Sequence, residues 1–178
     1  MILSLKNIAP ILNAKWVGIA ENTIIDNISI DSRSLQNGEH TLFFALVGAN
    51  NDAHLYISSL IDEGVQNFVV TRIPDNSKNK ANYLIVENTL MALQEFATYY
   101  RQLFDFRVIG ITGSNGKTIV KEWLSQILQT KFLVCKNPKS YNSQLGVALS
   151  ILELGKAHEI GVFEAGISQK SEMQRLEL

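Results

Sequence analysis

The stretch Val108-Ile-Gly-Ile-Thr-Gly-Ser-Asn-Gly-Lys-Thr118 decides the fold of this chain. It begins with apolar, β-branched residues, which are typical of a buried parallel strand. It continues into a turn in which Gly110, Gly113 and Gly116 allow the backbone N–H groups to approach a phosphate. A helix is predicted over residues 117–128, and its positive N-terminal end would point at the same place. The stretch therefore predicts a strand, a phosphate-binding loop and a helix.

Two side chains at the end of this loop have the chemistry of a nucleotide triphosphate site. Lys117 can reach the outer phosphates, and the Thr118 hydroxyl can ligate magnesium. The usual P-loop spacing has a glycine where this chain has Ile111. A glycine-rich turn with a surface lysine is therefore the alternative interpretation. A dinucleotide-binding turn is disfavoured, because the glycines do not follow the G-x-G-x-x-G pattern.

The composition is that of an ordinary globular protein. The chain has 178 residues, of which 46% are hydrophobic and 19% are charged, with a net charge of -1. This charge gives no indication of binding to nucleic acid or to a membrane surface, and no apolar run is long enough for a membrane span. Residues 1–20 contain no signal-peptide core. The single cysteine, Cys135, fits a reducing compartment, so we expect a cytoplasmic protein.

The first part of the chain has the pattern of a small α/β unit. Helices are predicted over residues 5–12, with Ser4 as the N-cap, and over residues 55–63. Strands are predicted over residues 24–30, 41–47, 67–71 and 83–86. Residues 73–82 are rich in Pro, Asp, Asn and Ser and are the most linker-like stretch.

The second part continues the alternation of strands and helices. Helices are predicted over residues 89–103, with Asn88 as the N-cap, over residues 117–128 and over residues 143–154. Strands are predicted over residues 106–111, 131–135 and 161–164. This alternation favours an α/β fold with a mostly parallel sheet and helices on its faces.

Two polar segments outside the loop are further candidates. Glu164 ends an apolar strand, and the carboxyl ends of parallel strands meet at one edge of a sheet, so we expect it near the phosphate loop. A carboxylate there can hold the magnesium that bridges the phosphates, although a strand-end carboxylate can also simply face water. The turn Tyr141-Asn142-Ser143-Gln144 opens a helix and is either a capping segment or a contact to a substrate or metal shell.

Several motifs, in this order along the chain, resemble the Mur ligases of peptidoglycan synthesis. The segment that receives the UDP-sugar in that family is similar to Asp31-Ser32-Arg33, Gly38, Phe43-Phe44-Ala45-Leu46-Val47-Gly48 and Asp52-Ala53-His54. The family's ATP-binding loop is similar to residues 110–118 followed by Lys121-Glu122. Its next segment resembles residues 141–147, and its magnesium-binding strand end resembles Glu164-Ala165-Gly166.

The resemblance implies an N-terminal UDP-sugar-binding domain over residues 1–86 and a central ATP-binding domain, the first part of a P-loop-type ATPase domain, over residues 87–178. It implies ATP and Mg²⁺ as cofactors, with Lys117 as the catalytic residue and with Thr118 and Glu164 as metal ligands. The implied phosphate contacts are Gly113, Ser114, Asn115, Gly116, Lys117 and Thr118. The implied UDP contacts are Asp31, Ser32 and Arg33, and further substrate contacts are Asn142, Ser143 and Gln144.

Within the family, the pattern is most similar to the ligase that adds D-alanyl-D-alanine to UDP-N-acetylmuramoyl-tripeptide. The implied reaction transfers the γ-phosphoryl group of ATP to the terminal carboxylate of the peptide. The amine of D-alanyl-D-alanine then attacks the acyl phosphate, and ADP and phosphate leave. The alternatives are a sister ligase that adds the third amino acid, a folylpolyglutamate-type ligase, and a UDP-sugar-binding module without catalysis.

The chain departs from the family pattern at three positions and in length. Ile119 stands where a second threonine is usual, Ala53 where a glycine is common, and Ser143 where an asparagine is frequent.

Family members carry the rest of the ATPase domain and a C-terminal domain, which would lie beyond Leu178. We therefore expect an N-terminal fragment that is inactive by itself and binds the UDP-sugar peptide but not Mg-ATP. An exposed sheet edge would remain, which a second copy could cover to form a homodimer.

Overall fold

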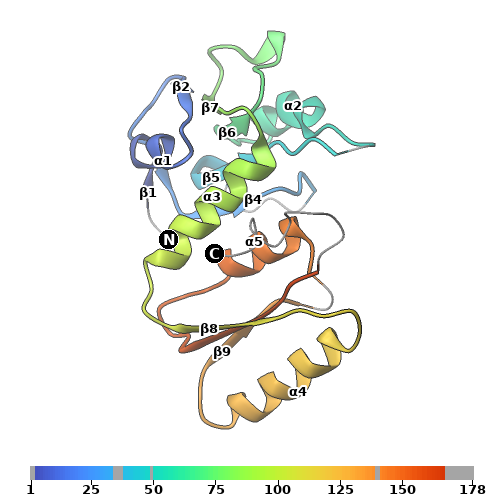
Figure 1. Ribbon diagram of the computed structural model, residues 1–178. Helices are drawn as coiled ribbons and strands as arrows, with labels where there is room; N and C mark the ends of the chain where they lie inside the picture. The colour runs from blue at the N-terminus through green and yellow to red at the C-terminus, as the bar shows by residue number, and fades with distance from the viewer. Residues whose placement is uncertain (1–2, 34–37, 49, 139–140, 167–178) are drawn as a thin grey trace. The chain divides into compact units, whose positions relative to one another are not determined.

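A computed structural model describes residues 3–33, 38–48, 50–138 and 141–166 of the chain. Within these residues the fold is α/β with mostly parallel strand pairing, as the sequence predicted. The chain divides into two compact units, Met1–Glu95 and Phe96–Leu178, and the boundary falls inside helix α3 (Thr89–Gln102). Figure 1 labels most helices and strands, and each unit is described by itself below.

The first unit is built on a five-stranded sheet in the order β2-β7-β6-β5-β4. Its strands are β2 (Lys15–Val17), β4 (Asn27–Ser29), β5 (Thr41–Phe44), β6 (Asn67–Val70) and β7 (Asn82–Ile85). Strand β2 is antiparallel to β7, and the other neighbours are parallel. A separate antiparallel pair joins β1 (Leu3–Ser4) to β3 (Ile24–Ile25). The helices are α1 (Leu5–Ile11), α2 (Ile57–Asp62) and the short 3₁₀ turns η1 (Gly38–His40), η2 (Ala53–Tyr56) and η3 (Asp75–Ser77).

One local prediction in this unit is wrong in detail, and another is confirmed only in position. The single strand predicted over residues 24–30 is two strands, because the N–H of Asp26 donates to the His40 carbonyl at 3.1 Å and breaks the regular ladder. Ser4 occupies the N-cap of α1, but its side chain makes no capping hydrogen bond. The N–H of Leu5 instead donates to the carbonyl of Thr23 at 3.0 Å.

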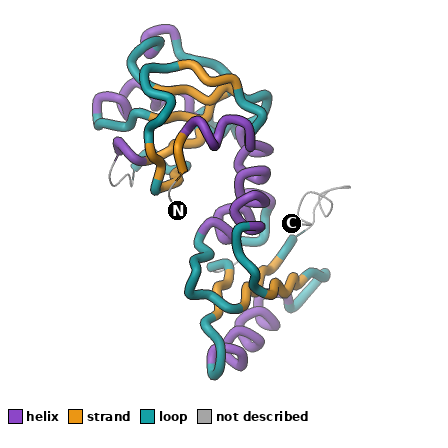
Figure 2. Tube along the Cα trace, turned by 90° about the vertical axis from the view of Figure 1, so that its left-hand side faces the viewer, coloured by secondary structure: helices purple, strands orange, loops and turns teal. Residues whose placement is uncertain are grey.

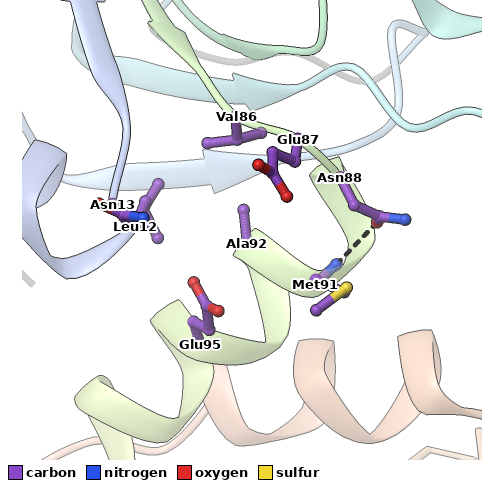
Figure 3. Close-up of a pocket in the computed structure, with 8 residues that line it drawn as sticks. All are labelled: Leu12, Asn13, Val86, Glu87, Asn88, Met91, Ala92 and Glu95. Carbon is purple, nitrogen blue, oxygen red and sulfur yellow. Dashed lines mark hydrogen bonds between the residues drawn. The ribbon is translucent and has the colours of Figure 1, made fainter.

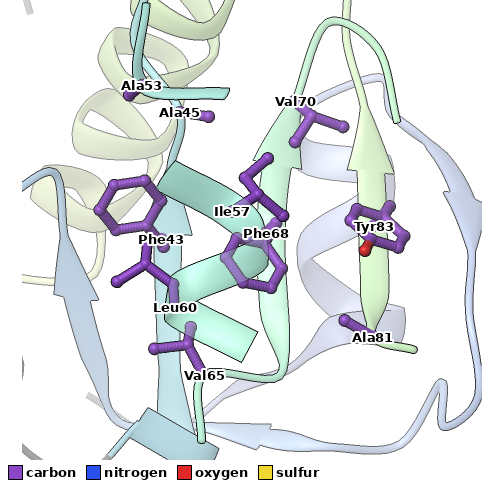
Figure 4. Packing of buried hydrophobic residues seen from close by; sticks show 10 residues of the cluster. All are labelled: Phe43, Ala45, Ala53, Ile57, Leu60, Val65, Phe68, Val70, Ala81 and Tyr83. Carbon is purple, nitrogen blue, oxygen red and sulfur yellow. The ribbon is translucent and has the colours of Figure 1, made fainter. Parts of the chain in front are cut away.

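Aromatic and aliphatic side chains together form a hydrophobic core in the first unit (Figure 4). Phe68 stacks on Tyr83 with 5.8 Å between ring centroids and meets Phe43 edge-on at 6.2 Å. The buried Tyr83 hydroxyl donates to the main-chain oxygen of Ser77 at 2.7 Å. Ser77, Ala81 and Asn82 are buried, so this linker-like stretch is part of the first unit and does not separate the two units.

The second unit contains a three-stranded parallel sheet. Its order is β8 (Arg107–Ile111), β10 (Ile160–Glu164) and β9 (Val134–Lys136). Helices α4 (Lys117–Gln129) and α5 (Gln144–Leu152) cover opposite faces of this sheet in both views (Figures 1 and 2). The α4 side is sealed by apolar side chains of the helix and sheet: Leu124, Leu128, Val134, Ile160 and Val162.

The register of β8 and β10 brings two distant segments together. Glu164, the last residue of β10, lies opposite Ile111, the last residue of β8. The N–H of Ala165 donates to the Ile111 carbonyl at 2.9 Å and extends the pairing by one residue. The prediction that Glu164 lies at the same sheet edge as the loop is therefore confirmed.

Candidate functional site

The loop between β8 and α4 depends on two of its three glycines. Gly113 has φ +145° and Gly116 has φ +76°, both conformations that L side chains rarely adopt. Gly110 lies inside β8 and has no such φ. A Cβ there would also meet nothing within 4 Å. The turn predicted from three glycines therefore rests on Gly113 and Gly116 alone.

The first residues of α4 face the loop. Gly116 is the N-cap in the left-handed conformation, and the first N–H groups of a helix lack partners within it. The Lys117 ammonium folds back and donates to the Gly113 carbonyl at 2.7 Å. Ser114 and Asn115 are exposed on the loop. The loop therefore presents N–H groups, a helix N-terminus and one ammonium group, the donors that a phosphate chain requires.

Thr118 connects the loop to the buried carboxylate of Glu164. The Thr118 hydroxyl donates to Glu164 Oε2 at 2.8 Å, and the side-chain amide of Asn142 donates to Oε1 at 2.8 Å. Glu164 is only 1% exposed. The structure thus brings together three predicted site residues that are far apart in the sequence.

A hydroxyl and a carboxylate are the oxygen ligands that Mg²⁺ prefers. Within the described residues no group of three or more His, Cys, Asp or Glu side chains could hold a metal ion. The arrangement therefore suits a Mg²⁺ ion that takes its remaining ligands from phosphates and water, as is usual at nucleotide sites.

Ser143 and Gln144, the other residues predicted near the loop, begin α5. The Ser143 hydroxyl accepts the N–H of Gly146 at 3.1 Å and is the N-cap of the helix, while Gln144 is the first helical residue. A Cβ on Gly146 would lie 2.8 Å from the carbonyl carbon of Tyr141, so the turn folds tightly against the helix. The capping role that we considered for this segment is thus observed for Ser143.

Asn137 is a functional candidate that the sequence analysis missed. Its amide nitrogen donates to the main-chain oxygens of Glu164 at 2.8 Å and of Tyr141 at 2.6 Å, and its Oδ1 accepts the Glu164 N–H at 2.9 Å. It is fully buried and directly follows β9. The signal that could have identified it is its position after an apolar strand, at the same sheet edge as Glu164.

The first unit has a separate pocket of about 460 Å³. Its lining includes all three predicted UDP contacts: Ile30, Asp31, Ser32, Arg33, Phe43, Asn51, Ala53 and Tyr56. The Arg33 guanidinium donates to both carboxylate oxygens of Asp31, Nε to Oδ1 at 2.9 Å and Nη2 to Oδ2 at 2.8 Å. These hydrogen bonds from Arg33 lower the pKa of Asp31 to about 2. The guanidinium remains 85% exposed and available to an anionic ligand.

Asp52 and His54 fix the wall of this pocket. The imidazole Nε2 of His54 accepts the Thr71 N–H at 3.0 Å, so the proton is on Nδ1, which lies 2.7 Å from Asp52 Oδ1. Burial raises the pKa of Asp52, but hydrogen bonds from Arg72 and His54 outweigh it and bring it down to about 2. This pair therefore anchors η2 to the end of β6.

A second pocket in the first unit is smaller, about 130 Å³ (Figure 3). It is lined by Leu12, Asn13, Val86, Glu87, Asn88, Met91, Ala92 and Glu95. Asn88 caps α3 there as predicted, because its Oδ1 accepts the N–H groups of Leu90 and Met91 at 2.9 and 3.0 Å. The lining carries two carboxylates and no cation, which does not suit a nucleotide.

Known proteins of one family are similar to this chain. Residues 111–178 match the Mur ligase middle domain. Over 97% of its length the chain is 34% identical to the UDP-N-acetylmuramoyl-tripeptide–D-alanyl-D-alanine ligase of Bacillus subtilis. Over 96% of its length it is 35% identical to the ligase of the same name from Haemophilus influenzae. The chain spans only 38% and 37% of the lengths of these two relatives.

Solved structures give the same result. A structure of MurF from Acinetobacter baumannii superposes with a TM-score of 0.89 at 29% identity, covering 99% of this chain and 38% of that one. MurF from Thermotoga maritima in complex with ADP superposes with a TM-score of 0.75 at 31% identity, covering 84% of this chain and 34% of that one. None of the helices in the described ranges is long and apolar enough to cross a membrane. Loop, carboxylate, sequence and fold agree in their similarity to the Mur ligases, whose middle domain matches residues 111–178.

Proposed function

We propose that this chain carries the phosphate-binding loop and the UDP-sugar pocket of an ATP-dependent ligase. The ligase adds D-alanyl-D-alanine to UDP-N-acetylmuramoyl-tripeptide in peptidoglycan synthesis. The observation that carries the proposal is the hydrogen bond from Thr118 to the buried Glu164 carboxylate at the end of the glycine loop. The names of the relatives in two bacteria supply the substrates.

The residues of the loop would bind and orient the phosphates of ATP. Gly113, Ser114, Asn115 and Gly116 offer backbone N–H groups, and Lys117 neutralises charge on the phosphoryl group that moves to the peptide carboxylate. An acyl phosphate forms at that carboxylate, and the amine of D-alanyl-D-alanine displaces the phosphate. Asn142, Ser143 and Gln144 would contact substrate beside the loop.

Thr118 and Glu164 would hold a Mg²⁺ ion. Their hydroxyl and carboxylate oxygens are the ligand types that fit it, and the 2.8 Å hydrogen bond shows that they already lie together. Bound there, the ion would neutralise phosphate charge.

The pocket of the first unit would bind the UDP part of the substrate. Asp31, Ser32 and Arg33 line it, and the exposed Arg33 guanidinium suits a diphosphate. We propose that residues 1–86 form the UDP-sugar-binding domain and residues 87–178 the first part of the ATP-binding domain. Residues 167–178 of the latter lie outside the described residues.

Isothermal titration of the 178-residue chain with UDP-N-acetylmuramoyl-tripeptide and with Mg-ATP tests the proposal. We expect micromolar-range binding of the first ligand and binding of the second too weak for calorimetry, because the chain spans 38% of the relative's length. Arg33→Gln should abolish the first signal, whereas Lys117→Ala should leave it unchanged. A wild-type chain that does not bind the UDP-sugar peptide would contradict the assignment of the pocket.

A binding module without catalysis is the second candidate, favoured by the pocket of the first unit, because that unit does not contain the loop. A ligase assay of the complete protein separates the two functions, because a ligase releases phosphate and a binding module does not. A sister ligase that adds the third amino acid would release phosphate with a free amino acid instead of D-alanyl-D-alanine. We place the reaction in the cytoplasm, where ATP and UDP-sugars are found.

A homodimer is a further part of the proposal. Among the described strands β8 pairs only with β10, and Val108 on it is 42% exposed. Unpaired sheet edges readily pair with another chain. Light scattering over a wide concentration range should show a dimer, and a monomer at all concentrations would contradict it.

A further inference from the structure

Lys121 is a charged residue beneath the phosphate loop to which the proposed function gives no role. It lies on α4, one turn after Thr118, and its side chain is fully buried. Burying an ammonium group costs several kcal/mol unless the group is paired and hydrogen-bonded. Its position therefore depends on the groups that compensate its charge.

The neighbours of the Lys121 ammonium include three oxygen atoms. Nζ donates to the main-chain oxygen of Asn137 at 2.9 Å, and it lies 3.5 Å from Glu122 Oε1 and 3.7 Å from Glu164 Oε2. The two carboxylates differ in their surroundings. Glu122 is 36% exposed and also pairs with Lys136, whereas the side chain of Glu164 is 2% exposed. In the described part of the chain, the ion pair of Glu164 is with Lys121.

The ammonium lies where three elements meet. It is attached to α4, it binds the main chain just after β9 at Asn137, and it faces the side chain at the end of β10. The Asn137 side chain in turn holds both main-chain groups of Glu164. Lys121 thus acts on the same glutamate twice, through charge on its carboxylate and through the residue that fixes its backbone.

We propose that Lys121 is a positioning residue that holds the Glu164 carboxylate in place for the metal-bound nucleotide. It compensates the buried negative charge and keeps Oε2 on the Thr118 hydroxyl and Oε1 on the Asn142 amide before the nucleotide binds. The inference rests on the proposed function, since it names a residue that prepares the same site. Lys121 does not touch the nucleotide.

The first test needs no ligand and compares Lys121→Met with Glu122→Gln. Both changes remove one charge from α4, but only the first removes the partner of Glu164. The side-chain amide NMR signals of Asn142 report its hydrogen bond to Glu164. We expect these signals to move in Lys121→Met to the positions seen in Glu164→Gln, and to stay at wild-type positions in Glu122→Gln. Unchanged signals in Lys121→Met would overturn the inference.

The second test is a double-mutant cycle on weak nucleotide binding. Amide signals of Gly113 and Gly116 are followed with millimolar ATP, in Mg²⁺ and in EDTA. Residues that orient metal ligands typically change metal affinity by about 10–100-fold. We therefore expect Lys121→Met to reduce the Mg²⁺ enhancement of ATP binding by about tenfold or more, and to have no further effect in the Glu164→Gln background.

The outcomes separate the two proposals. Equal loss of ATP binding with and without Mg²⁺, or the same loss in both backgrounds, would show that Lys121 only supports the fold. If the wild-type chain binds no ATP under either condition, its proposed nucleotide binding fails, and the Asn142 signals decide the role of Lys121. If Lys121→Met does not fold, the double variant Lys121→Met/Glu164→Gln, which lacks both buried charges, should fold. Failure of the double variant as well would overturn the inference.

Discussion

Two buried polar pairs, one in each unit, lie at opposite ends of parallel strands. In the first unit Asn67 and Asn82 stand at the amino ends of β6 and β7, where the Asn82 amide donates to Asn67 Oδ1 at 2.9 Å. In the second unit Lys121 and Glu164 form a charged pair under the carboxyl edge, where β10 ends. A neutral amide pair can satisfy its hydrogen bonds within the fold.

This difference indicates that the buried amides of the first unit stabilise the fold, whereas the buried carboxylate of the second unit serves a ligand. Asn82 Oδ1 accepts the N–H groups of Ile19 and Ala20 at 2.9 and 2.8 Å, so its function is to hold a loop. The Glu164 carboxylate is buried at the sheet edge where ligands of parallel sheets bind. Burial of a charged pair contributes little to stability by itself, so stability alone does not explain the pair of Lys121 and Glu164.

The largest expected effect is on the carboxyl edge of the second unit. Lys117→Ala in the complete ligase should lower the rate of ligation by about 10²–10³-fold, the usual cost of losing one group that stabilises developing charge. The ammonium is near the surface and donates to the loop carbonyl of Gly113, so the free energy of unfolding should be almost unchanged. A ligase assay with D-alanyl-D-alanine measures the rate, and titration with the UDP-sugar peptide is the control. Retained turnover would remove Lys117 from the mechanism.

The next effect tests the amino ends of the first unit. Asn82→Ala leaves the N–H groups of Ile19 and Ala20 without their acceptor and should lower the free energy of unfolding by about 1–3 kcal/mol. Urea unfolding measures this loss. Binding of the UDP-sugar peptide at low temperature should be unchanged, because the pocket lining does not include Asn82. A specific loss of binding in a folded variant would break the contrast between the two ends.

A smaller effect separates Gly116 of the loop from Gly110 of the strand before it. Gly116→Ala should cost about 1–2 kcal/mol, because its φ of +76° is unfavourable for an L side chain. The matched variant is Gly110→Ala, where a Cβ meets nothing within 4 Å, and its unfolding free energy should change by less than about 1 kcal/mol. Thermal or urea unfolding of the two variants provides the comparison. Equal costs would mean that the loop conformation does not depend on Gly116.

The smallest effect is the titration of the exposed pair in the first unit. The pKa of Asp31 is lowered from 3.8 to about 2, so its ion pair with Arg33 is complete above pH 3.8 and is lost as pH falls through about 2. Carboxyl NMR signals of Asp31 should therefore titrate with a midpoint near 2. In Arg33→Gln the midpoint should return toward 3.8. A wild-type midpoint at the ordinary value would mean that the pair does not persist in solution.

Helices, strands and caps that depend on neighbouring residues could be predicted from the sequence alone. The strand before the loop, helix α4 and the Asn88 cap follow from apolar periodicity and capping residues, and the structure has them within one residue or two. The break at Asp26 could not be predicted, because it depends on the carbonyl of His40 from a distant turn.

The residues that would bind the ligand could be predicted from the sequence, but the buried residue that pairs with Glu164 could not. Thr118 and Glu164 could be placed together because the carboxyl ends of parallel strands share an edge. The buried lysine could not be recognised, since a helical pattern assigns Lys121 beside Glu122 to a solvated face. Only the three-dimensional packing shows that Lys121 is 0% exposed.

The pairing of β10 with β9 restricts the residue type at position 137. The main-chain ladder ends at Val162 opposite Lys136, and the side chain of Asn137 then binds the N–H and C=O of Glu164 as a peptide group of a neighbouring strand would. Aspartate offers no amide donor, and glutamine places its amide one methylene too far away. The Asn137 side chain thus replaces a main-chain pair of hydrogen bonds to Glu164, so the main chain need not continue the ladder at this position. We therefore expect neither aspartate nor glutamine to replace asparagine here.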